Sequence, residues 1–348
     1  MAPRALPFTL GVQMDANVHN LFQAELTTSW FMASDKWEIH HVPPEVCLAI
    51  EVADQRRHLL QVRRWLRQWA DTGSNPFIHE RLYKTRFPRY AQDAFMASAC
   101  YLNKTAATEK TVHKILEDRA EALISEYHET RSPVHGSSFD TNFPDTDLLE
   151  SLARVQALLV YQIIGLYDGD IRLRHLAERR IPVLHSWMGQ LLRQASGQSQ
   201  TSCLGSWMIF DQPRRHLYDP GARIAASQLQ NLLWYSWIMA ESIRRTWLLC
   251  SSVQGIYVFS RDGPDVAQCQ GGITFTTREG IWAAKTAAEW EALCVRESVR
   301  MVKMKDTDML FVDAVPEEVD EFTKMIMQVV FGSERMTSWR GLVPVSAT

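Results

Sequence analysis

The stretch LLWYSWIMAESIRRTWLL, residues 232–249, sets three charged side chains inside an apolar segment. Twelve of its eighteen residues are apolar, which predicts a buried helix. At about 100° per residue, seven positions fall on one face of that helix: Trp234, Trp237, Ile238, Glu241, Arg244, Arg245 and Leu248. The charges therefore point to the same side as the tryptophans, and the helix must bury them together.

The spacing of these charges favours a structural ion pair. Glu241 precedes Arg244 and Arg245 by three and four positions, and side chains at those spacings meet on one helix. A carboxylate and a guanidinium can then satisfy each other inside a bundle. A catalytic role is the alternative, because buried charged groups also gather at working sites. We favour the structural role, since charged networks inside proteins serve packing more often than catalysis.

The same three charges argue against a membrane span. Each would cost about 2.5 to 3.5 kcal/mol at the centre of a membrane helix. The N-terminal stretch MAPRALPFTLGVQ has one arginine and a short apolar run that Pro7 and Gly11 interrupt, which is too weak for a secretory signal. The sequence therefore predicts an intracellular protein, in the nucleus or cytoplasm, that does not enter a membrane.

Hydrophobic residues make up 46% of the 348, which is ample for a core. Thirty-seven basic against forty acidic residues give a net charge of −3, whereas proteins that live on DNA phosphates usually carry a marked basic excess. No glycine-rich nucleotide loop, nucleophile elbow or HExxH metal motif occurs, so we predict no cofactor. No two cysteines lie closer than nineteen positions, which excludes a zinc cluster built from neighbouring ligands: Cys47, Cys100, Cys203, Cys250, Cys269 and Cys294.

Most of the chain has the period of helices. We predict one all-α domain over 35–348, a multi-helix bundle with long loops and at most short strands, after a partly irregular segment 1–34. Loops are expected at 131–145 and 195–221. Short strands or extended loop are expected at 255–260 and 271–277. The predicted helices, of which the fourth and fifth are central, are 56–70, 90–102, 107–128, 148–167, 232–249, 282–302 and 317–331.

One predicted helix carries an arginine face. Residues 56–70 put leucine, valine and tryptophan on one side and five arginines on the other: Arg56, Arg57, Arg63, Arg64 and Arg67. A solvated outer face is our preferred interpretation, and a surface that grips an acidic partner is the alternative. Residues 306–321 carry seven acids and no base, so the two patches could pair with each other, with another copy or with a partner.

The sequence Asp168-Gly169-Asp170 follows the central helix 148–167. Two carboxylates so placed could hold a divalent cation. A turn followed by a helix cap explains the same residues, because glycine and aspartate are common at helix junctions. We favour the turn and the cap.

Four stretches, taken in order, resemble the helical regulatory region of fungal zinc-cluster transcription factors: 72–83 (TGSNPFIHERLY), 92–124, 153–178 and 237–249. The best single marker is E-x-x-R-R-x-W, formed by Glu241, Arg244, Arg245 and Trp247. The resemblance covers roughly residues 35–340. It implies an almost wholly helical domain that regulates activation and contacts other proteins.

The chain departs from that family at the DNA-binding module, since those factors begin with six closely spaced cysteines that hold two zinc ions. None of that pattern is present in these 348 residues. We therefore expect a transcription-regulator-like protein that acts through protein partners, self-association or a small-molecule effector and does not read DNA sequence by itself. The alternative is a helical biosynthetic enzyme, of cyclase or isomerase type, with an aromatic-lined pocket.

Overall fold

The computed structural model describes residues 29–40, 51–131, 147–196, 226–263, 272–296, 299 and 301–341. It confirms the predicted all-α class. The long elements are α2 (Val52–Thr72), α3 (Arg89–Leu102), α4 (Glu109–Arg131), α5 (Leu148–Tyr167), α6 (Ile171–Arg179), α7 (Ile181–Ser196), α9 (Ala226–Asp262), α10 (Ala287–Arg296) and α12 (Glu321–Gly341). Short elements are η1 (Ser34–Lys36), β1 (Thr274–Thr276), β2 (Met301–Lys303), η4 (Met304–Met309), α11 (Leu310–Asp313) and η5 (Pro316–Glu318).

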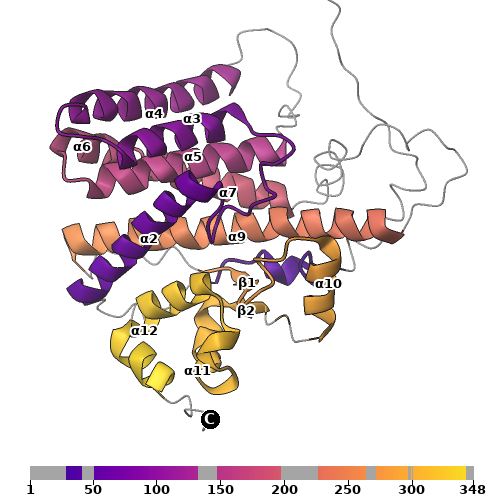
Figure 1. Cartoon of the computed structure of the whole chain (residues 1–348). Coiled ribbons are helices and arrows are strands. Elements are labelled where there is room, and N and C mark those ends of the chain that lie inside the picture. The colour runs from indigo at the N-terminus through magenta and orange to yellow at the C-terminus, as the bar shows by residue number, and fades with distance from the viewer. Residues whose placement is uncertain are drawn as a thin grey trace, which may run out of the picture.

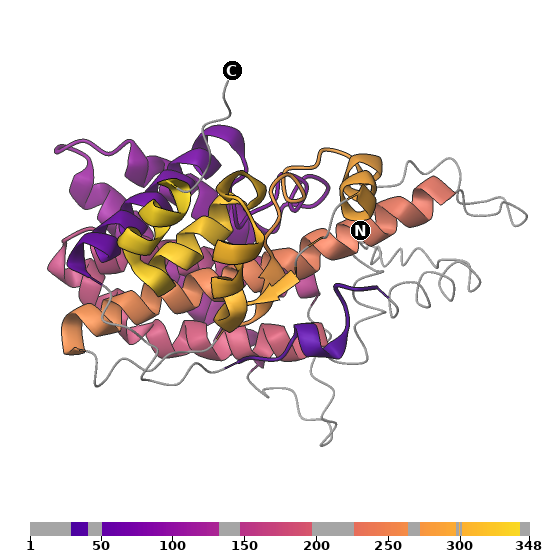
Figure 2. The same ribbon diagram turned by 90° about the horizontal axis from the view of Figure 1, so that it is seen from below.

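Helix α9 divides the molecule into two layers. Figure 1 shows α3 to α7 stacked on one side of α9, while the strands and α10 to α12 lie on the other side. Helix α2 crosses α9 and packs against α3 in the first layer and α12 in the second. Seen from below, the C-terminal elements cover the middle of α9 (Figure 2). Both layers therefore bury their apolar faces against one helix.

Helix α5 is buried on all sides, as its apolar sequence predicts. The Asp147 carboxylate caps its first turn by accepting from the Leu149 amide at 3.1 Å. Gly165 lets α6 approach, because a Cβ there would lie 2.8 Å from the Cβ of Ala177. In the described part of the chain, α5 is the one helix long and apolar enough to cross a membrane, but 89% of that segment is buried against other helices. Such burial is typical of a core helix.

The two strands form a small antiparallel sheet, with Phe275 opposite Val302. Strand β1 lies in the region 271–277, where the sequence predicts extended structure. Helix α10 ends at Arg296, so the helix predicted over 282–302 is wrong at both of its ends. Residues 301–303 pair with β1 instead, because strand pairing satisfies the backbone groups of both segments beside α9.

The extended segment predicted at 255–260 is also wrong, since those residues continue α9. Val253, Ile256 and Tyr257 are buried and follow one another at helical spacing, so they prolong the core face of the helix. Packing therefore overrides the strand preference of aromatic and β-branched residues. The loops predicted at 131–145 and 195–221 lie outside the described residues except at their ends. Of the segment 1–34, residues 29–34 are described, and Phe31 belongs to the core.

Helix α12 bends at Gly332, whose φ of 78° and ψ of 165° are not helical. Asp54 on α2 accepts a hydrogen bond from the Ser333 amide at 3.1 Å, and the Ser333 hydroxyl also donates to this carboxylate. The carboxylate thus caps the second half of α12. Arg57 lies 2.7 Å from the same carboxylate and donates to the Ser333 hydroxyl.

Candidate functional site

The charges of residues 232–249 meet in the middle of α9. The Oε1 of Glu241 accepts from the Nε of Arg245 at 3.2 Å and from the Thr276 amide at 2.9 Å. Its Oε2 lies 3.7 Å from the Nη1 of Arg244. All three side chains are at most 1% exposed. Glu241 therefore joins α9 to strand β1 at a point that solvent does not reach.

Arg245 binds more groups than its own helix supplies. Its Nη1 donates to the Pro76 carbonyl at 3.0 Å, its Nη2 donates to the Thr276 carbonyl at 3.2 Å, and a further bond reaches the Asp320 carboxylate. The guanidinium carbon lies 4.2 Å from the ring centre of Trp282. One side chain thus joins α9 to the loop after α2, to β1 and to the start of α12.

Arg244 is held mainly by an aromatic face. Its guanidinium carbon lies 4.2 Å from the ring centre of Trp37, and its Nη2 donates to the Phe31 carbonyl. Burial lowers the pKa of Arg244 to about 10, so the side chain stays protonated at neutral pH. Two guanidiniums and the carboxylates of Glu241 and Asp320 balance each other. Because these charged groups are paired with one another inside the protein, the network fastens α9 to its neighbours.

The tryptophans of the predicted signature are part of the core. Trp234, Trp237 and Trp247 are at most 5% exposed and belong to one large cluster of apolar side chains. A cavity of about 220 Å³ beside the network has Trp282 as the one tryptophan among its described lining residues. Four acids also line it: Glu80, Glu279, Asp320 and Glu321. The cyclase-type alternative would need several tryptophans and free carboxylates to converge on a closed cavity. These residues do not form one.

Asp168, Gly169 and Asp170 form a turn between α5 and α6. Asp168 accepts from the Tyr101 hydroxyl at 2.6 Å and from the Lys104 ammonium at 2.7 Å. Burial opposes its ionisation, but these hydrogen bonds outweigh burial and leave the pKa of Asp168 below its usual value. Gly169 has a φ of +109°, and Asp170 caps α6. The pair does the work of a turn and a cap, and within the described ranges no cluster of His, Cys, Asp and Glu could hold a metal ion.

All five arginines on the outer face of α2 are exposed, and two of them also contact other helices. Arg63 donates to the carbonyl of Tyr167, the last residue of α5, and Arg67 donates at 2.6 Å to the carbonyl of Leu102, the last residue of α3. A guanidinium suits a helix C-terminus because the final carbonyls lack partners and carry partial negative charge. Arg56 is exposed. Two members of the face therefore cap other helices.

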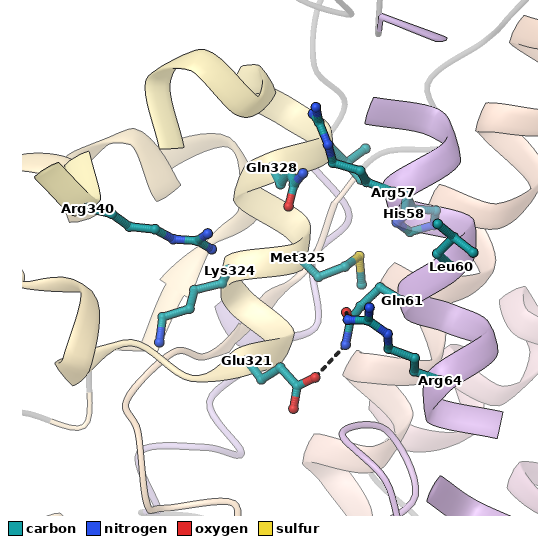
Figure 3. A pocket seen from close by; sticks show the side chains of 11 residues that line it. Arg57, His58, Leu60, Gln61, Arg64, Glu321, Lys324, Met325, Gln328 and Arg340 are labelled. Atoms are coloured by element: carbon teal, nitrogen blue, oxygen red, sulfur yellow. Dashed lines mark hydrogen bonds between the residues drawn. The ribbon is translucent and has the colours of Figure 1, made fainter. Parts of the chain in front are cut away.

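The remaining two arginines of this face line a pocket between α2 and α12, which we call the α2–α12 pocket. It has a volume of about 380 Å³. Arg57 and Arg64 line it from α2, Lys324 lines it from the first half of α12, and Arg340 lines it from the second half (Figure 3). The apolar part of its wall is formed by three side chains: Leu60, Met325 and Val329.

Positive charge dominates the α2–α12 pocket. Among the residues that the structure describes, four cations line it and Glu321 is its one acid. Glu321 is already engaged, because its Oε1 accepts from the Nε2 of Gln61 at 2.5 Å and from the Nε1 of Trp65 at 2.9 Å. Arg64, Lys324 and Arg340 form no ion pair with any residue that the structure describes.

Sequence reasoning identified Arg57 and Arg64 but missed the rest of this pocket. Its second wall starts 257 positions after Arg64, at Glu321, and no local pattern connects the two segments. The excess of basic residues over 51–90 was the available signal. It indicated a charged surface without showing which other helix completes it.

Comparison with known proteins gives one informative match. The chain is 30% identical over 274 residues to "Transcription factor gsfR2" of Penicillium aethiopicum, a match that covers 78% of this chain and 58% of that protein. No protein-family model and no solved structure matches the chain. The match supports a role in transcription regulation. Over most of its own length, and over rather more than half of that protein's length, the chain is thus related to a fungal transcription factor.

Proposed function

We propose that this chain is the regulatory part of a transcription regulator, that it acts in the nucleus through protein partners or a small-molecule effector, and that it controls a fungal biosynthetic pathway. The similarity to a transcription factor across 78% of the chain carries this proposal. The buried network of α9 supports it, because Arg245 is bound to the carboxylates of Glu241 and Asp320 and joins neighbouring elements. Such charges are then unavailable for chemistry on a substrate.

We further propose that the chain does not read DNA sequence with the helices described. Specific readout needs an element whose side chains reach base edges in a groove. The most basic helix, α2, uses Arg63 and Arg67 to cap two neighbouring helices. Its remaining guanidiniums can attract phosphate, which gives loose binding that depends on salt rather than on sequence.

Deletion of the gene tests the proposal when transcripts and metabolites are profiled together. A regulator predicts that the transcripts of a set of genes fall while the corresponding metabolites disappear. Accumulation of one intermediate with unchanged transcripts would contradict regulation and support the enzyme alternative. A strain in which the gene is restored serves as the control, and the restored gene should return the transcripts to their normal level.

A further inference from the structure

We propose that the α2–α12 pocket is the effector site and that it binds a small organic acid with an apolar skeleton. The role as effector rests on the proposed regulatory function, whereas binding by itself does not. The size of the pocket, its charge and one buried histidine support this assignment. The test below distinguishes this acid from a neutral ligand.

The dimensions of the pocket suit a small molecule. A volume of about 380 Å³ lies within the range of about 300 to 1,000 Å³ that is usual for ligand sites. Met325 is buried and Val329 is half-buried, so together they offer an apolar surface. Arg64 and Arg340 are exposed and Lys324 is half-buried. A ligand that matches this wall has an apolar body with a negative charge at one side.

Charge decides the sign of the ligand. Glu321 accepts from the neutral donors Gln61 and Trp65 and keeps its negative charge, but it is outnumbered by the cations of the lining, so the wall of the pocket carries a net positive charge. Arg64, Lys324 and Arg340 form no ion pair with any described residue, so their charges remain available to an anionic ligand. A carboxylate also matches guanidinium geometry, because both groups are planar and can form two parallel hydrogen bonds.

His58 supplies an independent observation. Its side chain lines the pocket, is 3% exposed, and neither ring nitrogen has a hydrogen-bond partner in the described structure. Buried polar atoms in proteins nearly always have a partner, and leaving one without a partner costs free energy. Burial lowers the pKa of His58 to about 3, so the neutral ring keeps one donor and one acceptor at physiological pH. A carboxylate at the inner end of the pocket would accept from that donor.

The pocket also lies beside the bend in α12. Arg57 lines it and at the same time contacts Asp54 and the Ser333 hydroxyl, which hold the second half of α12. An anion that draws the Arg57 guanidinium toward the pocket loosens this contact. Binding therefore changes how firmly the segment after Gly332 is attached, which gives the effector a structural consequence at a distance from its own contacts.

The test uses the fluorescent anion 1-anilinonaphthalene sulfonate with the purified full chain. The double variant Arg64→Gln/Lys324→Gln should raise its dissociation constant about fivefold or more, because it removes two cations from the site. Arg56→Gln is the matched control, since Arg56 lies on the same helix but outside the pocket, and it should leave binding unchanged. Naphthoate should displace the probe, and naphthoate's uncharged amide should not.

Equal affinity of the double variant and the wild type would overturn the proposal, as would equal competition by the amide. Arg340→Gln offers a second route should the double variant fail to fold. His58→Phe keeps a ring in place and removes both nitrogens, so it should weaken naphthoate competition. A folded His58→Phe variant with wild-type competition would also count against the site.

Transcript profiling separates the two proposals. If the double variant weakens binding of the probe but deletion of the gene leaves transcripts unchanged, the pocket is supported as an anion site and the regulatory function is contradicted. If deletion lowers transcripts but the double variant binds the probe as tightly as the wild type, the regulatory function is supported and the pocket is contradicted. When both hold, a strain with the double variant should lose the response of those transcripts to pathway metabolites.

Discussion

The carboxylate of Glu241 and the guanidinium of Arg245 lie one helical turn apart on α9, 3.2 Å from each other and out of contact with solvent. The same carboxylate oxygen also accepts from the Thr276 amide. The pair therefore closes a junction between the longest helix and the sheet. Removing the Glu241 carboxylate takes one partner from the buried Arg245 guanidinium and leaves the Thr276 amide without its acceptor.

Glu241→Ala should reduce the free energy of unfolding by on the order of 3 kcal/mol or more, because a buried charge loses its partner. Urea denaturation followed by circular dichroism measures the change. Glu334→Ala is the control, since Glu334 is exposed on α12, and it should have little effect. Similar stabilities of the two variants would show that the Glu241 carboxylate contributes nothing to the junction.

His58 should make the fold weaker in mild acid. Burial lowers its folded pKa to about 3, whereas an unfolded histidine has a pKa of about 6.5, so unfolding takes up a proton between these values. Its contribution is complete above pH 6.5 and is lost as the pH falls toward 3. From pH 7 to pH 5 this costs about 2 kcal/mol.

The variant His58→Phe removes this proton uptake. Its free energy of unfolding should fall by about 2 kcal/mol less than that of the wild type between pH 7 and pH 5. Urea titrations of both proteins at the two pH values measure the difference. Parallel loss of stability in the two proteins would mean that His58 is not buried as the structure shows.

The bend of α12 should depend on the absence of a side chain at residue 332. Gly332 has backbone angles that other residues adopt only under strain, so Gly332→Ala should destabilise the fold by about 1 to 3 kcal/mol. A new Cβ would lie 3.5 Å from the nearest oxygen of Asp54, an ordinary contact, so the cost is in the backbone.

Gly255→Ala is the opposite case and serves as the control for Gly332→Ala. Gly255 lies inside α9, and a Cβ there would meet no atom within 4 Å. Alanine should therefore stabilise the helix by up to about 1 kcal/mol. Thermal unfolding should shift the midpoints of the two variants in opposite directions. Equal shifts would contradict the bend.

The purified chain should not distinguish a promoter fragment from scrambled DNA at physiological salt. Loose binding with dissociation constants of about 10⁻⁴ to 10⁻⁶ M, which weakens steeply with salt, is the expected behaviour. Fluorescence anisotropy with both DNAs measures it. Nanomolar binding that discriminates single base changes would refute the expectation and identify the arginine face of α2 as a recognition surface.

The long helices could be predicted because their periodicity lies within the sequence. The sequence predicts the core helix at 148–167 with its bounds, since its apolar run and Asp147 cap are local signals. The helical state of 255–260 could not be predicted, because its residues favour strands and the packing of Ile256 and Tyr257 into the core keeps them helical. The strand at 301–303 was missed since its partner β1 lies about 25 residues earlier in the chain.

The same limit applies to the sites. The contact between Glu241 and Arg245 follows from their spacing, whereas Asp320 joins Arg245 from 75 positions away. The ring of Trp282 reaches Arg245, and α12 completes the α2–α12 pocket, only through tertiary packing. Spacing on one helix predicts which side chains can meet. It does not predict which distant segment completes their surroundings.

The 37 residues of α9 form a rod about 55 Å long that both layers share. Among the described elements, α9 contacts α5 and α7 in the first layer and β1, α10 and α12 in the second. Loss of helical order in the buried middle of α9 therefore exposes core side chains of both layers at once. The described parts of the chain should accordingly melt as one cooperative unit, and a protease that cuts α9 should release no stable half.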